Sequence, residues 1–117
     1  ETSYYITFTL PNWTPAASNP RLYYWGSETS EGDFFTAGCE SNMTSLGDNT
    51  YYIEIDASVR IDGMIIIFDQ GSDVKQSMDI TENLPTTAGN YNIVMSGEWV
   101  QNSGGTWCFT ASIEEVK

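Results

Sequence analysis

The chain has 117 residues and a formal net charge of −12 at pH 7, because sixteen acidic residues are opposed by four basic ones and histidine is absent. This charge excludes nucleic acid and anionic membranes as partners, since both require clustered Lys and Arg. Without histidine there is no Cys/His zinc site and no Ser–His or Cys–His nucleophile pair. The 40% hydrophobic and 14% aromatic residues suffice for one folded domain, which we expect to span residues 1–117.

Short apolar, β-branched and aromatic runs alternate with turn-forming residues, and helical periodicity is not evident. The first two runs, residues 4–10 and 21–26, predict strands. In the first run every second residue from Tyr4 to Leu10 is large and apolar, so these residues should face the core. Residues 27–50 are polar and rich in turn formers, and they predict loops rather than strands.

The second half of the chain predicts further strands of the same kind. Residues 63–69 are apolar at alternate and intervening positions, so we expect a central strand covered on both faces. Trp99 should lie in the connection between the last two strands. The remaining strands are expected at residues 51–56, 75–80, 90–95 and 106–113. Together the pattern predicts an all-β fold, an antiparallel β-sandwich of about seven to eight strands of the immunoglobulin-like or jelly-roll-like kind. The longest apolar run, residues 64–68, is too short for membrane insertion.

Two cysteines, Cys39 and Cys108, lie far apart in the sequence. They form either a disulfide that closes a long loop or two buried thiols. The low lysine content, the abundant Asn, Ser and Thr, and the even cysteine count favour the disulfide and an extracellular setting. The chain begins at Glu1 without an initiator methionine or signal peptide, as an excised module or a processed secreted protein would.

Catalysis is not expected from this composition. Sixteen acidic residues supply carboxylate pairs by chance, and the group Glu28, Glu31 and Asp33 is best interpreted as solvated surface charge. A small sandwich also lacks the depth of a catalytic cleft. No cofactor is expected. A structural calcium ion at the loop from Asp69 to Asp73 is an alternative, but Asp, Gly and Ser form turns without a metal, so a turn is favoured.

Tyr23 and Trp25 are the most informative aromatic residues. In a strand they share one face, while Leu22 and Tyr24 share the other. If Leu22 and Tyr24 face the core, Tyr23 and Trp25 form an exposed aromatic surface that suits the apolar face of a pyranose ring. The alternative is that these rings belong to the core or form ordinary cross-strand pairs.

Two segments resemble the starch-binding carbohydrate-binding modules of families 25 and 26. Residues 21–28 (RLYYWGSE) resemble the family's Tyr-rich strand with its Tyr-x-Trp-Gly-like end. Residues 63–80 (GMIIIFDQGSDVKQSMDI) resemble its Ile-Ile-Phe-Asn-x-Gly-like strand and turn, followed by Gln-Thr-x-Asp. Asp69 replaces the family's Asn and Ser77 its Thr, and the tail after Pro85 does not match. The pair Asn12-Trp13 also resembles the family's Asn-Trp after the first strand.

The resemblance implies a non-catalytic module that binds α-1,4-glucan, such as starch or maltooligosaccharides. Such a module is monomeric within a longer polypeptide, typically a secreted or cell-surface bacterial amylase or starch-capture protein. Two non-coplanar aromatic planes would match consecutive glucose units of the bent chain. Alternatives are an adhesion or protein-interaction sandwich, or a spacer domain of a bacterial surface protein.

The resemblance also implies the binding residues. Tyr23 matches a strand tyrosine and Gln76 the glutamine, while Trp25 follows on the same face. The family's loop tryptophan is missing, and Phe34 or Phe35 is the nearest substitute. Arg21 stands where the family has an earlier tyrosine. Lys75 would join Gln76 in hydrogen-bonding sugar hydroxyls. The predicted glucan-binding residues are thus Tyr23, Trp25, Phe34, Phe35, Lys75 and Gln76.

Overall fold

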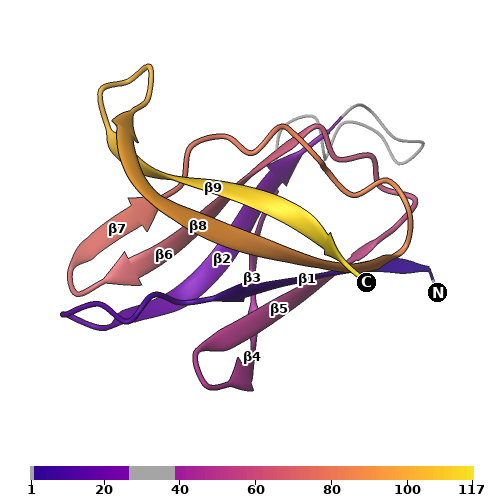
Figure 1. Ribbon diagram of the computed structural model, residues 1–117, viewed down its shortest axis with the longest axis horizontal. Coiled ribbons are helices and arrows are strands. Elements are labelled where there is room, and N and C mark those ends of the chain that lie inside the picture. Colours follow the sequence, from indigo (N-terminus) through magenta and orange to yellow (C-terminus); the bar gives the residue numbers. More distant parts are fainter. Residues whose placement is uncertain (1, 27–38) are drawn as a thin grey trace.

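The structure, a computed structural model, describes residues 2–26 and 39–117, with the side chain of Cys39 excepted. The described residues form nine strands and no helix, arranged in two sheets that pack against each other (Figure 1). The all-β sandwich predicted from the sequence is therefore confirmed. In the described ranges no helix has the length and hydrophobicity needed to cross a membrane.

The larger sheet has five strands in the order β4-β5-β1-β8-β9. β1 lies at its centre, antiparallel to β5 and parallel to β8, so the sheet is mixed rather than purely antiparallel. The hairpin of β8 and β9 extends beyond the rest of the sheet as an arm (Figure 1). The strands are β1 (Ser3–Thr9), β4 (Thr44–Gly47), β5 (Thr50–Asp56), β8 (Gly89–Gln101) and β9 (Trp107–Val116).

The smaller sheet has four strands in the order β3-β2-β6-β7. β6 lies between β2 and β7, which is the central position expected for it. β6 and β7 form a hairpin whose turn contains Gly71 at a φ of 61°, so residues 70–73 form the predicted turn, and Asp69 lies in β6 opposite Val74. No group of three metal-ligating side chains comes together among the described residues. The strands are β2 (Ala17–Trp25), β3 (Cys39–Asn42), β6 (Gly63–Gln70) and β7 (Asp73–Gln76).

The core lies between the two sheets and follows the alternation of the sequence. The inward residues of β1, Tyr4, Ile6 and Phe8, are at most 2% exposed, which confirms the predicted pattern. Opposite them, Met64, Ile66 and Phe68 of β6 are fully buried. The intervening residues Ile65 and Ile67 are only half-buried, so the expectation that β6 is covered on both faces is wrong. A sandwich of two sheets has only one interior, and β6 turns its second face outward.

Two of the sequence-based boundaries are wrong for identifiable reasons. Residues 39–47 form the edge strands β3 and β4, although residues 27–50 predicted loops. An edge strand pairs through its backbone, and all four residues of β4 are exposed, so no apolar pattern marks it. Trp99 lies within β8 rather than in a connection, because β8 continues through a register shift between Met95 and Trp99 that contains Gly97 at a φ of 89°.

The segment after β7 closes one edge of the sandwich. β7 ends at Gln76, earlier than the predicted strand of residues 75–80. The buried hydroxyl of Ser77 accepts a hydrogen bond from the Ile66 amide, and the Ser77 amide donates to the Ile66 carbonyl. The next amide, that of Met78, donates to the carbonyl of Phe109 in β9 at 2.8 Å. The two sheets are thereby joined by backbone hydrogen bonds at this edge.

Cys108 is a free, buried thiol in β9. Its Sγ donates to the carbonyl of Thr106 at 3.5 Å. Burial, and secondly the Asp79 carboxylate, raise the pKa of this thiol. The backbone of Cys39 pairs with Tyr24 in the other sheet, and its side chain lies outside the described residues. Of the two alternatives for Cys108, the structure holds the buried thiol and not the disulfide.

A conservative pair of substitutions in β6 tests which face of the strand forms the core. Ile66→Val should lower the free energy of unfolding by about 0.5–1.5 kcal/mol, because the methyl group leaves a closed interior. Ile65→Val removes the same methyl group from the half-buried outer face and should cost less. Urea denaturation measures both values. An equal or larger loss for Ile65→Val would contradict the assignment of faces.

Candidate ligand-binding surfaces

The outward face of β2 carries the predicted aromatic pair. Leu22 is fully buried and Tyr24 is 7% exposed, whereas Tyr23 and Trp25 are half-buried on the other face. The ring centroids of Tyr23 and Trp25 lie 5.8 Å apart, and the ring planes are inclined by 46°. The structure therefore places Tyr23 and Trp25 together on the outside of the four-stranded sheet. We call this pair the β2 surface.

Gly63 on the neighbouring strand determines where the Trp25 ring lies. Trp25 pairs with Gly63 across β2 and β6, and Tyr23 pairs with Ile65 in the next row. A Cβ atom added to Gly63 would come within 2.2 Å of the Trp25 ring. The ring thus occupies the space that any other residue would fill, so a glycine at this strand position lets the indole lie flat on the sheet.

Arg21 lies in the next row of the same face, and carboxylates hold it there. Its Nε lies 3.2 Å from Oε2 of Glu40, and one terminal nitrogen lies 3.1 Å from Oδ1 of Asp69. The other terminal nitrogen donates to the carbonyl of Asn19 at 2.9 Å. The Arg21 side chain is only 13% exposed, so its guanidinium holds the sheet together and is not presented to solvent as a free donor.

Asp69 is the acceptor at the centre of this network. A hydrogen bond from the Asn19 amide lowers the pKa of the Asp69 carboxyl, Arg21 adds a hydrogen bond and its charge, and burial opposes the shift. The carboxylate therefore stays ionised and links β6 to the irregular segment of β2 between Ser18 and Arg21. The network keeps the β2 surface in register with β6.

The two polar residues predicted for one site point to opposite faces of β7. Gln76 pairs with Ile67, which pairs with Arg21, so Gln76 lies on the outward face. Its side-chain amide also forms a hydrogen bond with the Cys108 thiol, which opposes the rise in the pKa of that thiol. Lys75 pairs with the fully buried Phe68 and therefore lies on the other face. The structure does not bring Lys75 and Gln76 to one face, because successive strand residues alternate. Phe34 and Phe35 lie outside the described residues.

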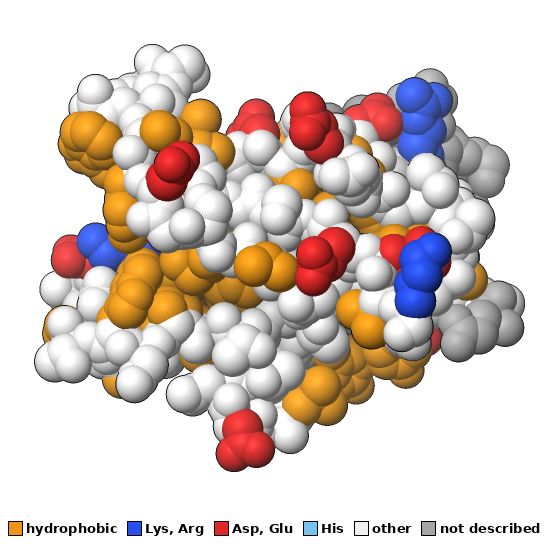
Figure 2. Space-filling view, in the orientation of Figure 1, with side chains coloured by type: hydrophobic (Ala, Val, Ile, Leu, Met, Phe, Trp, Pro, Cys, Tyr) orange, Lys and Arg blue, Asp and Glu red, His pale blue; other side chains and the backbone are white. Residues whose placement is uncertain are grey.

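A second aromatic site, which the sequence did not predict, lies where Lys75 points. The rings of Trp13 and Trp99 lie 5.9 Å apart with planes inclined by 33°. Trp13 contacts Phe68 at 5.5 Å, and Trp99 contacts Phe109 at 5.9 Å, so both indoles lie on core rings. Figure 2 shows hydrophobic side chains gathered beside the β6–β7 hairpin and below the β8–β9 arm, next to a basic side chain.

These rings line an open groove of about 490 Å³, which we call the Trp13–Trp99 groove. Lys75 Nζ lies 5.9 Å from the centre of the Trp99 ring, within the range of a cation–π contact. The sequence held no direct signal for this site, because the register shift in β8 brings Trp99 to it. Its lining residues are Asn12, Trp13, Thr14, Gln70, Lys75 and Trp99.

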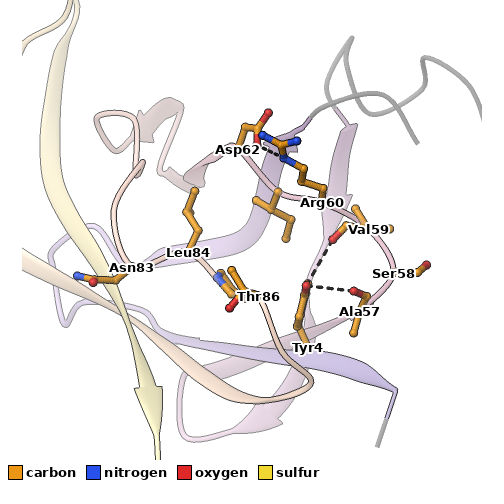
Figure 3. Close-up of a pocket in the computed structure, with 11 residues that line it drawn as sticks. Tyr4, Ala57, Ser58, Val59, Arg60, Asp62, Asn83, Leu84 and Thr86 are labelled. Carbon is orange, nitrogen blue, oxygen red and sulfur yellow. Dashed lines mark hydrogen bonds and ion pairs between the residues drawn. The ribbon is translucent and has the colours of Figure 1, made fainter. Parts of the chain in front are cut away.

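A separate cavity, of about 620 Å³, lies near the start of β1 and is lined by residues 57–62 and 83–86 (Figure 3). The Tyr4 hydroxyl points into this region and donates to the Ala57 carbonyl at 3.1 Å. Burial raises the pKa of Tyr4, and Arg60 is paired with Asp62. Tyr4 is 2% exposed, so it presents no ring face to a ligand, and its hydroxyl joins β1 to the loop after β5.

Comparisons with models of protein families, with curated proteins and with solved structures found no significant match.

The contact between Gly63 and Trp25 can be tested by substitution. Gly63→Ala should displace the indole and lower the free energy of unfolding by about 1–3 kcal/mol, because the added methyl group overlaps the ring. Near-UV circular dichroism would report the displaced ring, and urea denaturation the stability. Gly104→Ala is the matched control, since its methyl group would only touch the Asn102 side chain at 3.5 Å. Indistinguishable results for the two variants would contradict the proposed packing.

The Asp69 network makes part of the stability depend on pH. Because the folded-state pKa of Asp69 is lowered, its contribution is present above the ordinary aspartate pKa of about 3.9 and is lost as pH falls through the lower folded value. Asp69→Asn should therefore destabilise the protein at pH 7, and the difference from the parent should shrink near pH 2. Urea denaturation at both pH values measures this. A difference that stays constant with pH would refute the ionised role of Asp69.

Proposed function

We propose that this chain is a non-catalytic module that binds α-1,4-glucan through the β2 surface. The observation that carries the proposal is the geometry of Tyr23 and Trp25, whose rings are adjacent, outward-facing and inclined by 46°. The C–H groups on one side of a pyranose ring favour the electron-rich face of an aromatic ring. Two inclined rings suit consecutive glucose units of a bent chain, whereas a flat β-1,4 chain requires coplanar rings.

Polar groups around the two rings supply hydrogen bonds to sugar hydroxyls. The side chains of Glu40 and Asp69 are 51% and 32% exposed. Arg21 pairs with Oε2 of Glu40, which leaves Oε1 to accept from a sugar, whereas the two oxygens of Asp69 already accept from Arg21 and Asn19 and have only their remaining lone pairs to offer. Glu40 pairs directly with Tyr23 across β2 and β3. Each such hydrogen bond would contribute about 1 kcal/mol. A neutral glucan also suits a chain of net charge −12, because it requires no basic residues.

The exposure of the surface limits both its affinity and its chemistry. The rings are open on one side, so only part of each sugar unit loses its water, and little free energy remains after the cost of association. Several weak modules in one polypeptide would bind through avidity. We place the module in a secreted or cell-surface protein that degrades or captures starch. An open surface does not enclose a scissile bond or exclude water, so catalysis is not part of the proposal.

A protein-binding role is the second candidate function. The outer face of the five-stranded sheet exposes Tyr5, Leu46 and Val116 at 40%, 59% and 50%. Tyr5 stacks on Tyr52 with centroids 5.6 Å apart, and an open depression of about 460 Å³ lies over these residues. An exposed apolar surface of this kind is typical of interaction sites. It lies on the sheet that does not carry the β2 surface, so substitutions distinguish the two candidates.

Affinity electrophoresis in gels containing amylopectin tests the proposed function. The parent protein should be retarded relative to a gel without polysaccharide, and Tyr23→Ala and Trp25→Ala should each weaken binding by about tenfold, equivalent to about 1.4 kcal/mol. Tyr5→Ala, a tyrosine on the other sheet, is the matched control and should leave retardation unchanged. Hydroxyethylcellulose gels measure the discrimination against flat β-1,4 chains.

Two results would count against the proposal. An unretarded parent protein would remove glucan binding altogether and leave the protein-binding candidate. Retardation that survives both Tyr23→Ala and Trp25→Ala would show that the β2 surface is not the site. Circular dichroism of each variant establishes that it is folded before its mobility is interpreted.

A further inference from the structure

We infer that the Trp13–Trp99 groove is a second carbohydrate-binding site, which takes a pyranose unit of a neutral glycan independently of the β2 surface. It shares the ligand class of the proposed function but none of its residues. Either site can therefore fail without the other.

The aromatic walls of the groove are rigid. Trp13 lies against Phe68 and Trp99 against Phe109, and these two phenylalanines stack on each other at 5.5 Å in the core. The indoles are thus supported from below, while Trp99 remains 41% exposed above. Rings that are already fixed lose little conformational entropy when a sugar stacks on them. Their mutual inclination of 33° leaves a wedge that is open to solvent.

The rim of the groove carries groups that match sugar hydroxyls. Asn12 and Thr14 are exposed beside Trp13, in the loop between β1 and β2. The Gln70 amide nitrogen donates to the Pro15 carbonyl at 3.1 Å, which holds this loop against β6 and leaves the amide oxygen as an acceptor. Hydroxyls both donate and accept, so a rim with both kinds of group fits them.

Lys75 adds a positive charge, and among the described residues no carboxylate lies within ion-pair distance of it. Arg21, Arg60 and Lys117 each have a carboxylate within ion-pair distance. Among the described residues Lys75 has none, and its ammonium lies over the edge of the groove, 5.9 Å from the Trp99 ring centre. Its N–H groups are therefore available to sugar oxygens. We assign a neutral rather than an anionic glycan, because a net charge of −12 repels a polyanion at long range.

The two sites face different directions. Lys75 and Gln76 are successive residues of β7, and they point to the groove and to the outward sheet face respectively. A glycan in the groove would lie at the edge of the sandwich, between the sheets, and one on the β2 surface would lie across the four-stranded sheet. One module with two such sites would hold two chains, or two segments of one chain, and gain avidity.

Nuclear magnetic resonance of the indole N–H groups tests the groove directly, because the chain has only four tryptophans. We would titrate the double variant Tyr23→Ala/Trp25→Ala, which removes the β2 surface, with maltoheptaose and with cellohexaose. At least one sugar should shift the Trp13 and Trp99 signals in a saturable way, with a Kd of about 1 mM. The Trp107 signal should stay in place, since Trp107 is 60% exposed on the same arm but does not line the groove.

Substitutions in the groove then assign the contacts. Trp99→Ala should weaken binding by about tenfold, and Lys75→Gln by about threefold, while the matched control Trp107→Ala should leave it unchanged. If Trp99→Ala does not fold, Trp99→Leu keeps an apolar side chain over Phe109 and should still lose the stacking. Circular dichroism establishes folding for each variant.

Three outcomes would overturn the inference. The first is that neither sugar moves the Trp13 and Trp99 signals. The second is that only oligogalacturonate moves them and 0.5 M NaCl abolishes the effect, which would make the groove an anion site. The third is that a decaproline peptide moves them and the sugars do not, which would make it a peptide site. Failure of amylopectin binding through Tyr23 and Trp25 is a separate result, because those residues are absent from the titrated variant.

Discussion

The stacking of Phe68 in the centre of the sandwich is the contact on which both candidate surfaces depend. Its ring, from the four-stranded sheet, stacks on Phe8 of β1 and Phe109 of β9, both in the five-stranded sheet, at 6.0 Å and 5.5 Å, and it is fully buried. Fixing Phe68 inward fixes the phase of β6, because strand residues alternate. Ile65 and Ile67 must then face outward, and the register of β2 on β6 turns Tyr23 and Trp25 outward with them. The same ring supports Trp13, which forms one wall of the groove.

Alternation explains which parts of the fold the sequence predicted. β1 and β6 have one buried face, so hydrophobic residues at every second position identify them, and β2 separates Leu22 and Tyr24 from Tyr23 and Trp25 in the same way. The edge strands carry no such pattern, since their pairing depends on backbone groups. The position of Trp99 depends on a register shift in the pairing of β8 with β9. The residue pattern of one segment does not reveal how it pairs with another, so the sequence did not predict this position.

Lys75 and Gln76 point to opposite faces of β7, although both were predicted for one site. Both residues lie in a segment that the sequence predicted as a strand, and neighbours in a strand point to opposite faces. The period of two therefore already separates them, and the resemblance itself matches only Gln76. The structure agrees with the period: Lys75 pairs with a core residue and Gln76 with an outward one. The β2 surface accordingly consists of Tyr23 and Trp25, Gln76 lies on the same sheet face in the row of Arg21, and Lys75 lines the groove.

Local pairing adds to the effect of the net charge in determining what each surface can bind. Beside the β2 surface, the Arg21 guanidinium is held by two carboxylates, so the excess charge there is negative and the exposed polar atoms are mainly acceptors. The groove has an ammonium and neutral amide and hydroxyl groups, and thus offers more donors. A sugar hydroxyl can satisfy either set, because it both donates and accepts. The two surfaces would therefore orient the same glycan differently, with hydroxyl hydrogens directed to carboxylates on β2 and β3 and hydroxyl oxygens directed to Lys75. A charged glycan could not suit both, since a carboxylate that pairs with Lys75 would be repelled by Glu40 and Asp69.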